Sequence, residues 1–257
     1  MSIADMFRLD GHVALITGGG GGLGGAMARA FADMGADVVV TARSADTLDA
    51  VREEVEKRGR RAATIAADIV DPATPKMLVE ETISRFGKLS ILVNNAGGLG
   101  GVDTTPLPLN QLSEESWAAQ INLNLTSVWR TSKAASLHLS AGGVILNISS
   151  IKAFKPEGGS GAYGAAKAAL NNMTVALAHD LAPRIRVNAI APGPVPTEAF
   201  KRVRRVTEAD YPRVAKEWGV PLGRVGHVDD IAAAAVFLAS NAGSWITGQT
   251  IIIAGGM

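Results

Sequence analysis

The chain has 257 residues, of which 47% are hydrophobic and none is cysteine. This composition excludes a disordered chain, a disulfide scaffold and thiolate chemistry. Its 25 lysines and arginines nearly equal its 24 aspartates and glutamates, for a net charge of +1, so no charge excess indicates a nucleic-acid or membrane partner.

Seven short runs of apolar residues recur along the chain and alternate with helical patterns. Most of these runs are continuously apolar, which is typical of parallel strands covered by helices on both faces. We therefore predict strands at 12–17, 37–42, 62–67, 89–93, 143–148, 185–190 and 249–253.

Between the strands, apolar residues recur with helical spacing, first in a stripe from Leu23 to Met34. Further helices are predicted at 44–58, 74–86, 113–140, 161–182, 198–217 and 228–240. The alternation predicts an α/β fold, namely a Rossmann-like, doubly wound, seven-stranded and mainly parallel sheet with helices on both faces. We interpret residues 1–257 as one domain and the irregular stretch at about 194–226 as a substrate lid.

A glycine cluster from Thr17 to Gly25 lies between the first predicted strand and the first predicted helix. Glycines there allow a tight turn and a close backbone approach to a pyrophosphate, which the helix N-terminus attracts. The order of strand, turn and helix favours nucleotide binding; the alternative is a flexible turn without a ligand. The predicted cofactor-binding residues of this cluster are Gly18, Gly20, Gly21, Gly22, Leu23 and Gly24.

The end of the second predicted strand bears on the choice of cofactor. An acid there would bind the ribose 2′-hydroxyl of NAD, whereas an arginine accommodates the 2′-phosphate of NADP. This strand ends in Ala42, Arg43 and Ser44 without an acid, so Arg43 and Ser44 are predicted to bind the cofactor. NADP(H) is favoured and NAD(H) remains possible; the alternative is a solvated arginine at a strand end.

Tyr163 and Lys167 lie four residues apart in a helical, alanine-rich stretch, which places both side chains on one helix face. A phenol has a pKa of about 10, and a nearby cation lowers that pKa. The pair therefore indicates a tuned proton donor and acceptor, against the alternative of an ordinary surface pair.

Polar residues also follow the fourth and fifth predicted strands. Ser150 ends the fifth strand 13 residues before Tyr163, where its hydroxyl is able to hold a carbonyl oxygen or to serve as a helix cap. Asn95 either stabilises a turn or contacts a sugar, and the amide of Asn124 serves either its helix or a water chain. The four histidines show no ligand spacing, so no metal site is predicted.

Taken together, these motifs resemble the short-chain dehydrogenase/reductase family in its cytosolic subgroup, and the resemblance covers nearly the whole chain. It rests on a TGxxxGxG pattern at 17–24, an NNAG segment at 94–97, and a serine, tyrosine and lysine at 150, 163 and 167. The resemblance implies a cytoplasmic homotetramer, with a homodimer as the alternative, and the lack of an apolar leader fits a cytoplasmic protein. It also implies cofactor contacts from Asp68, Ile69, Asn95, Ala96, Gly97, Pro192, Gly193, Val195, Thr197, Tyr163 and Lys167.

The resemblance also implies a role for each catalytic residue. Tyr163 is the general acid in carbonyl reduction, and Lys167 lowers its pKa and holds the nicotinamide ribose. Ser150 orients the substrate oxygen, and Asn124, with Asn122 as a nearby rival, supports a proton-relay water. One departure is Gly20, which replaces a serine common in this loop.

We therefore expect an oxidoreductase that transfers hydride between NADP(H) and a carbonyl or secondary alcohol. The alternatives are a nucleotide-sensing protein without turnover, a Rossmann methyltransferase, and an NAD-dependent hydroxysteroid-type or 3-oxoacyl reductase. The lid is rich in cations, which indicate either an anionic substrate or a solvated helix face. These cations are Lys201, Arg202, Arg204, Arg205, Arg213 and Lys216.

Overall fold

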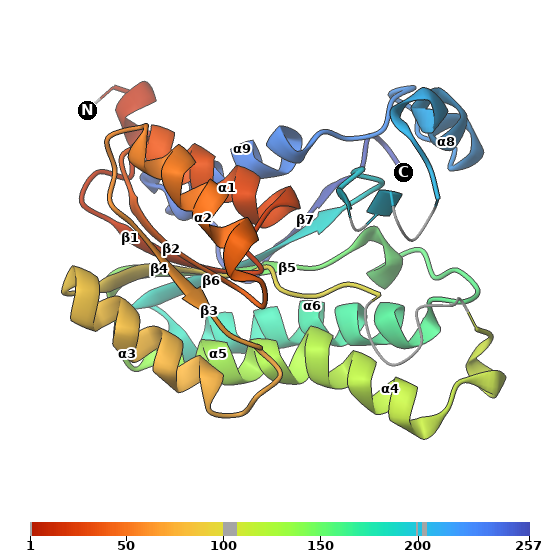
Figure 1. Ribbon diagram of the computed structural model, residues 1–257, viewed down its shortest axis with the longest axis horizontal. Coiled ribbons are helices and arrows are strands. Elements are labelled where there is room, and N and C mark those ends of the chain that lie inside the picture. The colour runs from red at the N-terminus through yellow and green to blue at the C-terminus, as the bar shows by residue number, and fades with distance from the viewer. Residues whose placement is uncertain (1, 100–106, 199, 202–204) are drawn as a thin grey trace.

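Seven strands form one sheet in the computed structural model, which describes residues 2–99, 107–198, 200–201 and 205–257. The strand order is β3-β2-β1-β4-β5-β6-β7 and every adjacent pair is parallel (Figure 1). The predicted doubly wound sheet is thus confirmed, and it is parallel throughout. The strands are β1 (Val13–Thr17), β2 (Asp37–Ala42), β3 (Ala62–Ala66), β4 (Leu89–Asn94), β5 (Leu139–Ile148), β6 (Ile185–Pro192) and β7 (Thr250–Ile253).

Helices cover both faces of the sheet, and the sheet separates two apolar cores. In Figure 1, α1 (Gly22–Asp33), α2 (Ala45–Glu56) and α9 (Val228–Ala239) lie on one face. On the opposite face lie α3 (Thr74–Phe86), α5 (Ser127–Ser136) and α6 (Gly161–Leu181). Every residue of β1 and β4 is buried between these layers, which explains their continuously apolar sequences. None of the helices in the described part of the chain has the length and apolar character needed to cross a membrane.

The helix predicted over 113–140 is divided in the structure. It begins as α4 (Glu114–Ile121), widens into a π-helical segment, η3 (Asn122–Thr126), and continues as α5. The Nδ2 group of Asn124 donates to the Gln120 carbonyl at 3.1 Å, which is the acceptor that a regular α-helix offers to the backbone N–H of Asn124. The side chain thus competes with the helix backbone at this point. Beyond α5, β5 begins at Leu139 rather than at residue 143, because Leu139 pairs with Leu89 of β4.

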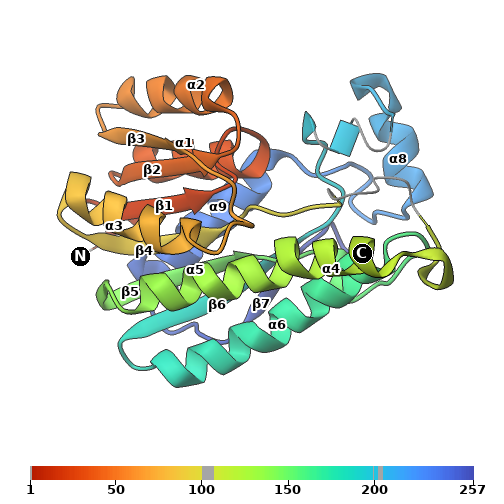
Figure 2. The ribbon, with the colours of Figure 1, turned by 60° about the horizontal axis from the view of Figure 1, so that its bottom comes forward.

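The helix predicted over 198–217 is also interrupted. Residues 199 and 202–204 lie outside the described part, and the residues from 205 onward form a short turn, Glu208–Asp210, followed by α8 (Tyr211–Glu217). Thr207 and Asp210 form a reciprocal capping box that starts this helical stretch. Figure 2 shows α8 apart from the helices that cover the sheet. A third apolar cluster holds it together, made of Val206, Val214, Ala215, Val220 and Val225.

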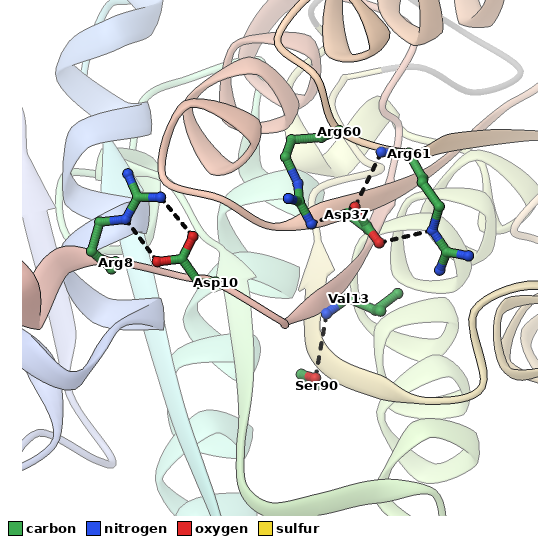
Figure 3. Close-up of polar contacts among 7 residues, drawn as sticks. All are labelled: Arg8, Asp10, Val13, Asp37, Arg60, Arg61 and Ser90. Atoms are coloured by element: carbon green, nitrogen blue, oxygen red, sulfur yellow. Dashed lines mark hydrogen bonds and ion pairs between the residues drawn. The ribbon is translucent and has the colours of Figure 1, made fainter.

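Ion pairs tie the strands together at the amino edge of the sheet, as Figure 3 shows. Asp37, the first residue of β2, accepts from Arg60 Nη2 at 2.8 Å and from Arg61 Nε at 2.9 Å. The backbone N–H of Val13 in β1 donates to Ser90 Oγ of β4 at 3.3 Å. These contacts join the starts of four strands, while the predicted site residues lie at the opposite, carboxyl edge.

Candidate active site

The loop after β1 packs against the loop after β4, at the point where the strand order reverses. Gly18 has a φ of +65°, and a Cβ there would lie 2.9 Å from the Ala96 Cα. A Cβ on Gly24 would lie 2.3 Å from the Gly18 carbonyl oxygen. Glycine is therefore required at both positions, because any side chain would separate the loop from its neighbours. Crevices at such a reversal of strand order are where doubly wound sheets bind ligands.

The hydroxyl of Thr17 joins these two loops, a role that the sequence analysis missed. It accepts from the backbone N–H groups of Asn95 and Ala96, both at 3.1 Å, and donates to the Val93 carbonyl at 3.3 Å. Asn95 completes the junction, because its Nδ2 donates to the carbonyls of Thr17 and Gly18 at 3.0 and 2.9 Å. The side chain of Asn95 thus stabilises a turn, one of its two predicted roles. The position of Thr17, at the end of a predicted strand and directly before a glycine, was the sequence feature that could have indicated this role.

The carboxyl end of β2 lies beside the glycine loop, where the Gly19 N–H donates to the Thr41 carbonyl at 2.9 Å. A Cβ on Gly20 would lie 2.4 Å from Thr47 Oγ1, so Thr47 of α2 fills the space next to Gly20. Arg43 and Ser44 are exposed here. Within the described part of the chain, no hydrogen bond or ion pair engages the Arg43 guanidinium, which leaves its donors available.

Asp68 and Ile69 follow β3 and differ in their surroundings. Asp68 is exposed and accepts from the Val70 N–H at 3.0 Å, whereas Ile69 is buried. The Asp68 carboxylate therefore shapes its own turn and keeps its remaining oxygen lone pairs available.

Ser150, Tyr163 and Lys167 come together at the carboxyl end of β5. Ser150 follows this strand, and the other two lie in the first two turns of α6. The Ser150 hydroxyl bonds with the Tyr163 phenol, and Lys167 Nζ lies 5.7 Å from the centre of the Tyr163 ring. Lys167 is 3% exposed and donates to the Ile148 carbonyl at 2.8 Å. The spacing in the sequence thus predicted the grouping correctly.

Burial is the main influence on the pKa values of both Tyr163 and Lys167. Burial raises the pKa of the Tyr163 phenol, and the hydrogen bond with Ser150 lowers it by less. Burial also lowers the pKa of Lys167 to about 8. Lys167 is not among the causes of the shift in the phenol pKa in the protein alone, where its ammonium donates to the Ile148 carbonyl. The phenol consequently holds its proton at neutral pH. The lowering of the phenol pKa by Lys167 beside a bound nicotinamide stays a prediction.

Asn124 faces this group from the π-helical segment and is fully buried. A Cβ on Gly97 would lie 2.8 Å from Asn124 Oδ1 and 3.2 Å from Lys167 Nζ, so Gly97 lies directly between the two side chains. Asn122, the rival candidate, is directed elsewhere and accepts from Arg130 Nη1 at 3.5 Å. The geometry therefore places Asn124, not Asn122, beside the predicted catalytic residues.

A chain of buried side-chain hydrogen bonds lies beneath the site. Asn94 Nδ2 donates to Ser132 Oγ at 3.0 Å and to Asn147 Oδ1 at 2.9 Å. Asn147 Nδ2 in turn donates to Thr174 Oγ1 at 2.9 Å. These bonds connect β4 and β5 with α5 and α6. Ser150 follows β5, and Tyr163 and Lys167 lie on α6. Buried networks of this kind make one arrangement rigid when every member is bonded.

The segment after β6 returns to the start of α1. Pro192 ends β6, and the Gly193 N–H donates to the Ile253 carbonyl at 2.9 Å. A Cβ on Gly22 would lie 3.2 Å from Thr197 Cγ2. The first and the last of the predicted cofactor-binding segments are thus neighbours, although they are far apart in the sequence.

A cleft of about 190 Å³ opens between this segment and the base of the predicted lid. Gly193, Val195, Val220 and Ala254 are among its lining residues, whereas none of the four predicted catalytic residues is among the described residues that line it. The cleft therefore adjoins the segment after β6 rather than Ser150, Tyr163 and Lys167. No group of three metal-ligating side chains occurs within the ranges that the structure describes.

Comparison with known proteins extends over the whole chain. A family model described as enoyl-(acyl carrier protein) reductase matches residues 19–257. An uncharacterized oxidoreductase of Mycobacterium tuberculosis is 46% identical over 258 residues, covering 99% of this chain and 95% of the relative. The short-chain dehydrogenase/reductase SDRA of Arabidopsis thaliana is 35% identical over 250 residues, covering 97% and 96%.

Among solved structures, a 7α-hydroxysteroid dehydrogenase in complex with NADH and 7-oxo glycochenodeoxycholic acid is similar to this chain with a TM-score of 0.91. It is 37% identical in sequence, and the match covers 100% of this chain and 98% of that one. The similarity thus includes the sheet, both helical layers and the segments that surround the candidate site.

Proposed function

This chain belongs to the short-chain dehydrogenase/reductase family and is an oxidoreductase, and from that premise we propose that it transfers hydride between NADP(H) and a carbonyl compound or secondary alcohol. The observation that carries the proposal is the grouping of Ser150, Tyr163 and Lys167 beside the glycine loop. The neutral phenol of Tyr163 supplies a proton, the hydroxyl of Ser150 supplies a hydrogen bond, and the buried ammonium of Lys167 supplies a positive charge.

The residues around the crevice fit a dinucleotide. The close contacts at Gly18 and Gly24 hold the loop backbone in place. Gly21 and Gly22 at the N-terminus of α1 are exposed, where free N–H groups would attract phosphate. Asp68 and Ile69 would hold the adenine end, and Gly97 and the segment 192–197 would flank the nicotinamide. When bound, NADP(H) supplies or accepts the hydride.

The preference for NADP(H) rests on the end of β2. Ala42, Arg43 and Ser44 carry no carboxylate, so no side chain of this turn would repel a 2′-phosphate. The exposed Arg43 guanidinium has planar donors that suit a phosphate, and no described residue occupies them.

In carbonyl reduction, each of the four residues has a distinct role. Tyr163 would donate its phenol proton to the carbonyl oxygen, and Ser150 would hold that oxygen by a hydrogen bond. The Lys167 ammonium stabilises the negative charge that the phenol acquires. Asn124 holds the Gly97–Gly98 backbone against Lys167 and supports a proton-relay water.

A second candidate substrate class is favoured by the comparison with the solved dehydrogenase, which binds a 7-oxo steroid acid and NADH. In this case the chain would act on a steroid ketone with NAD(H). The methyltransferase alternative has no use for Tyr163 and Lys167 and is not supported.

We also infer one domain with a lid at about 194–226, and a cytoplasmic homotetramer. The lid proposal is supported by the separate apolar cluster around α8. The tetramer is supported by exposed apolar residues near the edge strand β7, among them Trp245 at 98% exposure and Ile252 at 43%. Light scattering of the purified protein measures the assembly directly.

The decisive experiment is a panel of ketones, 7-oxo steroids, sugars and 3-oxoacyl thioesters, each offered with NADPH and with NADH. Loss of absorbance by the reduced cofactor reports turnover. We expect ketone reduction that is faster with NADPH. A protein that binds NADPH but reduces no carbonyl compound would instead be a nucleotide sensor.

A further inference from the structure

Lys152 connects the catalytic serine with the lid. It lies two residues after Ser150, whose Oγ accepts from the Lys152 backbone N–H at 3.2 Å. The Lys152 carbonyl oxygen packs against α6, where a Cβ on Gly164 would lie 3.1 Å from it. The backbone of Lys152 is thus held between the turn of Ser150 and the residue that follows Tyr163. Its side chain consequently starts from a fixed position beside the site.

The ammonium of Lys152 has two partners of different kinds. It forms an ion pair with Glu157 and lies 4.5 Å from the ring centre of Trp218, the residue that directly follows α8. The Lys152 side chain is 15% exposed, whereas that of Glu157 is 43% exposed. In the described part of the chain, Glu157 is the only hydrogen-bond acceptor for this ammonium. Since an ammonium has three donors, two remain for a ligand.

The described cations of the lid are either paired or exposed, and Arg205 and Lys216 are the exposed ones. Lys201 pairs with Glu198 at 2.9 Å, and Arg213 pairs with Asp210 at 3.1 Å and with Glu217 at 2.7 Å. These pairs neutralise charges that the sequence alone would assign to substrate binding. Arg202 and Arg204 lie outside the described residues. Lys152 therefore stands out as a partly buried cation beside Ser150.

We propose that Lys152 determines specificity for carbonyl substrates that carry a carboxylate. The substrate carbonyl lies at Ser150 and Tyr163, and the carboxylate takes the place of Glu157 at the Lys152 ammonium. Glu157 is exposed enough to regain water when it is displaced, so the exchange leaves no buried charge unpaired. The Trp218 ring stays over the ammonium and shields the new ion pair from solvent. This inference rests on the proposed carbonyl chemistry of the same site.

The test uses ketones that differ only in charge. These are 4-acetylbenzoate and 4-oxopentanoate, each beside its methyl ester. We expect the wild type to reduce the acids with a higher kcat/KM than the esters. Lys152→Met should lower kcat/KM for the acids by about 10- to 100-fold and change kcat/KM for the esters by less than about threefold. Lys152→Arg should restore much of the preference, because it restores the charge.

Two further variants separate a binding role from a structural one. Glu157→Gln removes the competing carboxylate. It should lower KM for the acids and leave KM for the esters unchanged. Lys155→Met removes a positive charge from an exposed position three residues along and should leave the preference intact. If Glu157→Gln instead lowers kcat/KM for acids and esters equally, the pair is structural and the inference is wrong.

A binding measurement makes the test independent of turnover. With saturating NADP⁺, 4-acetylbenzoate should raise the unfolding temperature of the wild type more than that of Lys152→Met. Equal shifts, or equal reduction of acids and esters by the wild type, would overturn the inference but not the proposed carbonyl chemistry. If the protein reduces none of these acids and esters and no ketone of the larger panel, the proposed function itself is contradicted.

Discussion

Asn124 and Gly98 exchange two hydrogen bonds, because Asn124 Oδ1 accepts from the Gly98 N–H at 2.9 Å and Asn124 Nδ2 donates to the Gly98 carbonyl at 3.1 Å. The same Nδ2 lies 3.0 Å from Gln120 Oε1. The Asn124 side chain thus bonds both the N–H and the carbonyl of Gly98, as the backbone of a paired strand would, and so holds the loop after β4. This places Gly97 against Lys167 and sets the floor of the site.

Replacing Asn124 by Asp should therefore destabilise the protein. A carboxylate would face the acceptors of Gly98 and Gln120 without a proton to donate, so we expect a loss of more than about 2 kcal/mol in the free energy of unfolding. Asn122→Asp is the matched control, since Asn122 faces Arg130, and it should change stability by less than about 1 kcal/mol. Urea unfolding measures both, and equal losses would contradict this role of Asn124.

Replacing Tyr163 by Phe should abolish most turnover and leave cofactor binding nearly unchanged. The change removes the proton donor but keeps the ring that lies over Lys167. We expect kcat to fall by about 10²- to 10⁴-fold. Turnover and NADPH titration by fluorescence measure the two effects separately. A variant that stays fully active would refute the assignment of proton transfer to Tyr163.

Replacing Lys167 by Met should stabilise the protein without cofactor while it lowers activity. Burial lowers the pKa of Lys167 from 10.5 to about 8, so below pH 8 the folded protein carries a buried charge at a cost of about 3 kcal/mol. As the pH rises from 8 to 10.5, the unfolded chain holds this proton longer than the folded one, and the stability of the wild type should increase.

The Lys167→Met variant should lack this increase. Urea unfolding from pH 7 to pH 10.5 compares the two proteins, and their difference in stability should shrink towards the alkaline end. Parallel profiles would mean that Lys167 titrates at an ordinary pKa in the folded protein.

Replacing Arg43 by Ala should shift the cofactor preference. If the guanidinium binds a 2′-phosphate, the ratio of kcat/KM for NADPH to that for NADH should fall by about 10- to 100-fold. Arg58→Ala is the control, since Arg58 pairs with Asp33 at 2.9 Å on the surface, and it should leave the ratio unchanged. An unchanged ratio in Arg43→Ala would show that this end of β2 does not select NADP(H).

Alanine at Gly24 and at Gly25 should have opposite effects. A Cβ on Gly24 would meet the Gly18 carbonyl oxygen at 2.3 Å, whereas the nearest atom to a Cβ on Gly25 lies at an ordinary 3.4 Å. Gly24→Ala should weaken both NADPH binding and folding. Gly25→Ala should stabilise α1 by about 0.5–1 kcal/mol, because alanine favours a helix interior. Thermal unfolding with and without NADPH measures both, and similar behaviour of the two variants would contradict the close contact.

The predicted strands agree with the structure to within a residue or two at their ends, except at the start of β5. A continuous apolar run predicts a buried parallel strand because the pattern is contained in consecutive residues of the run itself. Residues 140–142 at the start of β5 are exposed, and residue 140 falls within the helix predicted over 113–140. Their strand conformation depends on the pairing of Leu139 with Leu89, a contact with a distant part of the chain.

The grouping of Ser150, Tyr163 and Lys167 was predictable because one strand end and one helix face carry all three. The family resemblance favoured Asn124 over Asn122, but spacing along the chain did not decide between them, since a π-helical segment changes which side chain faces inward. Thr17 and Lys152 were missed for a related reason. Their partners, Asn95 and Trp218, lie in other loops, and spacing along the chain carries no information about such contacts.

The order of residues was sufficient to define the α/β class, the crevice beside the glycine loop and the helix that carries Tyr163, because each depends on interactions between near neighbours. The protonation of Tyr163 and Lys167 and the contact between Lys152 and Trp218 arose only when the chain packed. Burial and distance set both, and these depend on how the seven strands are ordered in space rather than on any local pattern.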